Sequence, residues 1–214
     1  MTPTQKPIAD NATEFGHTSS QKKIALYVDG GNFYHMSMTA LGWRVNPVKI
    51  VEWLNANKGT VVTARYYLST PNYFCRPLQF YIRFLSSRFQ VVPKPVKLIT
   101  REDGTSFEKA DMDVEMAVDA TKHIASHDVT VLVSGDSDFE YLAQEVTRAG
   151  KEIVVLSTRK MISHELRAAA GANYVDFEDI RHAVEYVPRK KAQPPKNDAQ
   201  NKISKTLTGE RNVD

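Results

Sequence analysis

Cysteine is almost absent from this chain of 214 residues, in which Cys75 stands alone. One thiol cannot form an internal disulfide, and it argues against a zinc site built from thiolates. Long apolar runs are absent too, since none approaches the ~18 residues that span a bilayer. Residues 1–21 also lack the apolar core of a secretory signal. We therefore expect a cytoplasmic protein that has no membrane partner.

The sequence also lacks the common signatures of nucleotide and zinc chemistry. It contains neither the G-x-x-x-x-G-K-S/T loop nor the G-x-G-x-x-G turn that hold phosphates, and its six histidines have no metal-ligand spacing. A phosphatase of the haloacid dehalogenase type needs an aspartate two residues after its nucleophile, whereas Gly31 stands two residues after Asp29. A phosphatase that acts on a small nucleotide is therefore the weakest alternative.

Basic charge is concentrated at the ends of the chain. The formal net charge is +3, and the segment from residue 188 onward carries seven basic residues against three acids. This segment contains prolines and has no apolar periodicity, and residues 1–21 are similarly polar. We expect disordered segments at 1–21 and 188–214 around one domain at 22–187. The basic tail can attract phosphates in a salt-sensitive way or serve solubility alone.

Apolar strand-like runs alternate with helical segments between these ends. Strands are expected at 23–28, 60–68, 89–92, 129–133, 152–156 and 174–177, with 96–100 continuing the third strand or pairing with it. Helices are expected at 33–41, 48–57, 77–88, 111–125, 139–149, 163–170 and 179–187. This alternation predicts a single α/β domain with a mostly parallel central sheet and helices on both faces.

Aspartates follow two of the predicted strands. Asp29 closes the first strand, and Asp136 and Asp138 follow the buried run at 129–133. Because the carboxyl ends of parallel strands meet at one edge of the sheet, these side chains should lie close together. Each also has a simpler explanation as a turn or capping residue. Ser137 and Glu140, for example, have the spacing of a capping box.

The helix at 111–125 carries two further candidate acids. We expect its inner face to contain the residues Val114, Ala117, Val118, Thr121 and Ala125. Asp113, about 40° from Ala117 around the axis, can then point past the sheet edge. Asp119 lies about 120° around the helix from Asp113 and ~9 Å along its axis, so the two side chains cannot easily share one site and a structural role is favoured for Asp119. Four converging acids without thiolates favour a hard cation, Mg²⁺ or Mn²⁺, and phosphodiester hydrolysis.

Three segments in order resemble the motifs of the NYN domain, the LabA-like branch of the PIN-like nucleases. They are Tyr27–Asn32, Lys109–Asp119 and Ser134–Phe139. The resemblance implies a PIN-like (Rossmannoid) domain, a Mg²⁺- or Mn²⁺-dependent site and RNA as the substrate. By position it implies the metal ligands Asp29, Asp113, Asp136 and Asp138. It also implies that Asn32 and Ser134 position the metal ligands or the attacking water, and that Asp119 is a second-tier candidate for the catalytic site.

Candidate RNA contacts lie on the helix at 77–88 and beside the second motif. Arg76, Phe80 and Arg83 share one helical face, an arrangement that can hold a single strand by phosphate contacts and stacking. Core packing or a homodimer interface explains the same pattern. Lys109, a candidate phosphate contact, stands four residues before Asp113, whereas the family spacing is often three, so it departs from the family pattern by one residue.

The sequence therefore predicts a metal-dependent ribonuclease of the hydrolase class that cuts RNA, which is expected to be single-stranded. The alternative is a catalytically silent RNA-binding or regulatory adaptor with the same fold, in which the acids serve as caps.

Overall fold

Runs rich in Val, Ile, Leu and Tyr form a six-stranded sheet at the centre of the computed structural model, which describes residues 21–188. The strands are β1 (Lys23–Asp29), β2 (Thr60–Thr70), β3 (Gln90–Pro95), β6 (Val129–Val133), β7 (Glu152–Ser157) and β8 (Tyr174–Asp176). Their order in the sheet is β3-β2-β1-β6-β7-β8, and all neighbours are parallel. The predicted α/β fold with a largely parallel sheet is confirmed.

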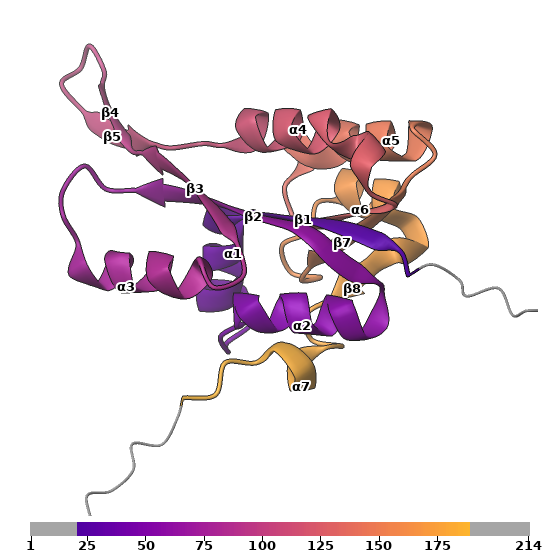
Figure 1. Ribbon diagram of the computed structural model, residues 1–214. Coiled ribbons are helices and arrows are strands. Elements are labelled where there is room, and N and C mark those ends of the chain that lie inside the picture. Colours follow the sequence, from indigo (N-terminus) through magenta and orange to yellow (C-terminus); the bar gives the residue numbers. More distant parts are fainter. Residues whose placement is uncertain (1–20, 189–214) are drawn as a thin grey trace, which may run out of the picture.

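Helices cover both faces of this sheet (Figure 1). One layer contains α1 (Gly30–His35), α2 (Pro47–Asn57), α3 (Arg76–Leu85) and α7 (Arg181–Val184). The other contains α4 (Asp113–Lys122), α5 (Glu140–Arg148) and α6 (His164–Ala170). The short turns are a π-helix η1 (Met36–Ala40) and the 3₁₀ helices η2 (Ile124–Ser126), η3 (Ser137–Phe139) and η4 (Gly171–Asn173). No helix in the described ranges is long and apolar enough to cross a membrane.

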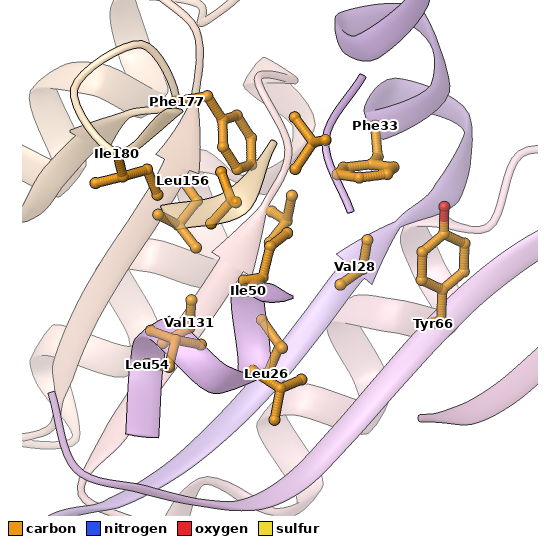
Figure 2. Close-up of a cluster of buried hydrophobic side chains, with 14 of the residues drawn as sticks. Leu26, Val28, Phe33, Ile50, Leu54, Tyr66, Val131, Leu156, Phe177 and Ile180 are labelled. Atoms are coloured by element: carbon orange, nitrogen blue, oxygen red, sulfur yellow. The ribbon is translucent and has the colours of Figure 1, made fainter. Parts of the chain in front are cut away.

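Alternate residues of the central strands supply two separate cores. Leu26 and Val131 point toward α2, where Figure 2 shows them beside Ile50 and Leu54. Tyr27 and the other strand residues that point to the opposite face of the sheet pack under α4, α5 and α6. All five residues of β6 are buried, as expected for a strand covered on both faces. These cores hold the carboxyl ends of β1 and β6 side by side.

The chain reverses its direction of sheet growth between β1 and β6. It runs outward from β1 through β2 to β3, and then crosses over to β6 on the other side of β1. Open α/β sheets bind their ligands at such a switch point, because the loops after the two strands diverge there. The last residue of β1, Asp29, and the residues after β6 flank this crevice.

Two local expectations are wrong. The segment 97–100 does not join β3 but forms β4 (Lys97–Thr100), which pairs with β5 (Ser106–Lys109) in an antiparallel hairpin that projects from the sheet (Figure 1). The inner face of α4 is also misplaced, since Val114 is 73% exposed and Val118 44% exposed. Met116 and Ala120 are buried instead. Met112 continues this stripe at four-residue spacing, so the helix is rotated from the expected phase.

The last helix is shorter than expected, because the chain leaves α7 at Glu185 to form an isolated bridge with Val45. The predicted disordered segments at 1–21 and 188–214 lie almost entirely outside the described residues.

Candidate functional site

Asp29 is both a helix cap and a site residue. It precedes the N-terminus of α1, and its Oδ1 accepts a hydrogen bond from the backbone N–H of Asn32 at 3.1 Å. Its Oδ2 accepts a hydrogen bond from the hydroxyl of Ser134 at 3.0 Å. Burial raises the pKa of this carboxyl, the two hydrogen bonds oppose the rise, and the negative charge of Asp136 adds to it. Capping and site formation are therefore one arrangement.

Asn32 and Ser134 tie the ends of β1 and β6 together. Ser134 is fully buried, and its Oγ also accepts a hydrogen bond from the backbone N–H of Asp136 at 3.2 Å. The side-chain oxygen of Asn32 accepts a hydrogen bond from the backbone N–H of Gly135 at 2.9 Å. A Cβ on Gly135 would lie 2.6 Å from the carbonyl oxygen of Met161, so a larger residue does not fit. Both predicted positioning residues thus hold the loops of the switch point.

The loop after β6 places two further carboxylates. Asp136 caps η3, and its Oδ1 accepts a hydrogen bond from the backbone N–H of Asp138 at 3.1 Å. The predicted capping box of Ser137 and Glu140 is wrong, because the Glu140 carboxylate accepts a hydrogen bond from the side chain of Gln144 instead. Asp136 rather than Ser137 begins this helical segment, and this fixes the backbone of Asp138.

Asp113 reaches the same region from α4. Its backbone N–H donates to Oδ1 of Asp111 at 3.1 Å. Its pKa is raised to about 8, first by burial, then by the hydrogen bond with the Asp111 side chain and by the negative charges of Asp29, Asp111 and Asp136. The charges that act on it thus come from its own helix start, from the end of β1 and from the loop after β6.

These carboxylates line one pocket of about 400 Å³. All four predicted ligands contribute to its wall, together with Asn32. Four other polar residues of the wall were not among the predicted site residues: His35, Tyr67, Ser69 and Asp111. His35 and Ser69 belong to no recognisable motif, and Asp111 is the first residue of the helix expected at 111–125. The place of His35, Tyr67 and Ser69 in the wall depends on how α1 and β2 pack, which no local pattern records.

The donor set of this pocket fits a hard divalent cation. Carboxylate oxygens are the preferred ligands of Mg²⁺ and Mn²⁺, and a cation relieves the repulsion among acids that the fold has brought together. Within residues 21–188, however, no group of three or more His, Cys, Asp or Glu side chains meets the geometry of a ready-made metal site. Metal binding therefore stays a prediction.

Asp119 lies outside the pocket and makes structural contacts. Its Oδ2 accepts hydrogen bonds from Nη1 of Arg65 at 2.5 Å and from the hydroxyl of Tyr67 at 2.8 Å. Burial raises its pKa, but the hydrogen bond from Tyr67 and the charge of Arg65 outweigh burial and lower the pKa overall. Because Tyr67 lines the pocket, Asp119 supports the wall from behind. This agrees with the structural role favoured from its helical phase.

Three of the predicted RNA contacts lie on α3, away from the acidic pocket. Arg76, Phe80 and Arg83 are exposed on α3, and Phe80 retains 65% of its surface. Core packing within one chain is thus the wrong explanation for Phe80, and the buried residue of the helix is Leu85. Lys109 is the last residue of β5. None of the three α3 residues contributes to the wall of the acidic pocket.

Comparison with known proteins places the chain in a family. The family model of the NYN domain matches residues 23–180. The chain is 29% identical over 172 residues to the low amplitude and bright protein LabA of Synechococcus elongatus, and the alignment covers 78% of this chain and 90% of LabA. A solved structure of a protein of unknown function from Vibrio parahaemolyticus has a TM-score of 0.65 and 27% identity, covering 80% of this chain and 100% of that one. The chain therefore belongs to the NYN domain family of the PIN-like nuclease superfamily.

Proposed function

We propose that this protein is a divalent-metal-dependent ribonuclease that hydrolyses phosphodiester bonds of single-stranded RNA in the cytoplasm. One observation carries the proposal. Asp29, Asp113 and the pair Asp136 and Asp138 come from three separated segments and line one pocket at the topological switch point. Helix capping alone does not require that these acids share a pocket.

The four aspartates would hold Mg²⁺ or Mn²⁺ at this pocket. A bound ion would supply positive charge for the phosphate oxygens and lower the pKa of water. The chain itself contributes orientation. Ser134 holds Oδ2 of Asp29, and Asn32 holds the loop that begins at Gly135. Asp119 keeps the Tyr67 side of the wall in place. These hydrogen bonds hold the carboxylates close to one another, although their negative charges repel.

The test incubates purified protein with single-stranded RNA in Mn²⁺, in Mg²⁺ and in EDTA. We expect cleavage with a divalent ion and none in EDTA. Asp136→Asn combined with Asp138→Asn should abolish cleavage, whereas Glu165→Gln on the exposed start of α6 should not. Calorimetric titration with Mn²⁺ gives a second readout, since the double variant should also lose binding. Cleavage that survives in the double variant rejects the site.

A regulatory adaptor with the same fold is the second candidate. It is favoured by the observation that, in the part of the chain that the structure describes, no three potential ligands form a ready-made metal site. The adaptor predicts RNA binding that is equal in EDTA and in Mn²⁺, with no turnover in either. The same incubation therefore separates the two candidates.

A further inference from the structure

A second and larger pocket adjoins the acidic pocket. It has a volume of about 650 Å³, which lies within the ~300–1,000 Å³ typical of ligand sites. Gly31, His35 and Ser69 line both pockets, so the two spaces meet along the end of α1 and the end of β2. A molecule that lies in one can extend directly into the other.

The walls of this second pocket differ in chemistry from the acidic pocket. They are aromatic and aliphatic, with the rings of Tyr34, Tyr66 and Tyr81, and no carboxylate of a described residue lines them. Among the described residues, Arg44 supplies the only arginine or lysine of this wall, and its side chain forms no ion pair with any of them. Flat apolar surfaces beside one cation suit a planar ring that is attached to a phosphate.

One buried polar group at this wall has no hydrogen-bond partner in the described part of the chain. Ser37 lines the pocket and is 9% exposed, and its hydroxyl makes no hydrogen bond among the described residues. Buried hydroxyls are normally paired, so an unpaired one beside a cavity points to a ligand that supplies the partner. Ser37 lies in the π-helix η1, a conformation that occurs frequently at functional sites.

We propose that this pocket binds the base of the nucleotide next to the phosphodiester in the acidic pocket, and that it thereby sets which bases the protein prefers. The inference rests on the proposed function, because it takes single-stranded RNA as the ligand. Tyr34 stacks on the base, Ser37 hydrogen-bonds to its edge, and Arg44 contacts the following phosphate.

The groove continues beyond Arg44 toward α3. A third pocket shares Arg44, Val45 and Tyr81 with the second, and it is also lined by Phe80 and Phe84. Phe80, expected from the sequence to stack on a base, thus lies at the far end of this path. The three connected pockets trace a route for several nucleotides from the acids to α3.

The test measures binding without requiring cleavage. Fluorescein-labelled RNA hexamers of one base each (A, U or C) are titrated with the full chain in EDTA, and the anisotropy is followed. Tyr34→Ala should weaken binding about tenfold, since a stacked base contributes on that scale. Arg44→Gln should lower the affinity for RNA. It should also make the slope of log affinity against log salt concentration shallower by about one, because one counterion fewer is released on binding. Ser37→Ala should narrow the difference in affinity among the three hexamers.

Two matched variants control for surface effects. Tyr141→Ala removes a ring from α5 that is 67% exposed, and Arg88→Gln removes an exposed arginine outside the groove. Both should bind like the wild type. Because Tyr34 is 59% exposed and Arg44 is exposed, neither groove variant should impair folding, which thermal unfolding checks. In a second measurement, a hexamer that contains one 4-thiouridine should crosslink within residues 30–45.

The outcomes separate this inference from the proposed function. Groove-dependent binding without any metal-dependent cleavage rejects the nuclease and supports the base pocket. Cleavage with the same KM in the wild type and in Tyr34→Ala rejects the base pocket alone. Crosslinks that map only to the β4–β5 hairpin or to residues 189–214 also overturn it. So does a Tyr34→Ala variant that converts a dimer to a monomer and leaves RNA affinity unchanged.

Discussion

The pocket is built from single aspartates whose neighbours hold them close to one another. The most perturbed is Asp113, whose folded-state pKa is about 8 against an ordinary value of 3.8. The folded protein therefore binds a proton more tightly than the unfolded chain between about pH 4 and pH 8. The stability that this proton contributes is fully present below the unfolded pKa and is lost as the pH rises through the folded pKa.

Replacing Asp113 by a neutral residue should remove this loss of folding stability at high pH. We predict that, in EDTA at about pH 8, Asp113→Asn is at least as stable as the wild type, and that lowering the pH to about 5 favours the wild type relative to the variant. Urea unfolding at both pH values measures the difference. A variant that is less stable by a similar amount at both pH values would show that Asp113 acts only as a helix-start residue.

Ser134 is the residue that links the acids to each other. Its buried hydroxyl donates to Asp29 and accepts from the backbone of Asp136, so Ser134→Ala leaves two polar groups without their partner. We predict a loss of about 2 kcal/mol in the free energy of unfolding. Ser87→Ala removes an exposed hydroxyl that donates a hydrogen bond to the backbone carbonyl of Phe84. It should change the free energy of unfolding by less than about 0.5 kcal/mol. Equal effects would contradict the bridging role.

At the scale of the element, the rotation of α4 decides which of its acids enters the pocket. Met116 is 1% exposed and lies against the sheet, whereas Val114 is 73% exposed. Met116→Ala should therefore cost about 2–4 kcal/mol through lost burial and a cavity. Val114→Ala should cost less than about 0.5 kcal/mol. Denaturant unfolding measures both, and the opposite ranking would restore the helix phase expected from the sequence.

At the scale of the whole molecule, a metal ion that binds only the folded state should stabilise the fold. At a concentration of Mn²⁺ about 100 times its Kd, the free energy of unfolding should rise by about 2.7 kcal/mol. Thermal unfolding with and without Mn²⁺ measures this rise. Asp136→Asn with Asp138→Asn should remove it. An equal rise in the double variant would place the binding elsewhere in the chain.

The sequence by itself determined the alternation of strands and helices and the three motifs that carry the aspartates. Those features are local, since a buried strand, a following aspartate and a helix start lie within a few residues of one another. Asp29, Asp113, Asp136 and Asp138 could be predicted for this reason, and all four line one pocket.

Only the tertiary structure decided the rest. The phase of α4 depends on which residues the sheet covers, and valines at helical spacing gave the wrong face. Asp119 is committed to Arg65 and Tyr67, more than 50 positions away along the chain. His35, Ser37 and Arg44 join one groove because α1, η1 and the segment between η1 and α2 lie beside β2 and α3. Such contacts depend on long-range packing, and no spacing within one segment records them.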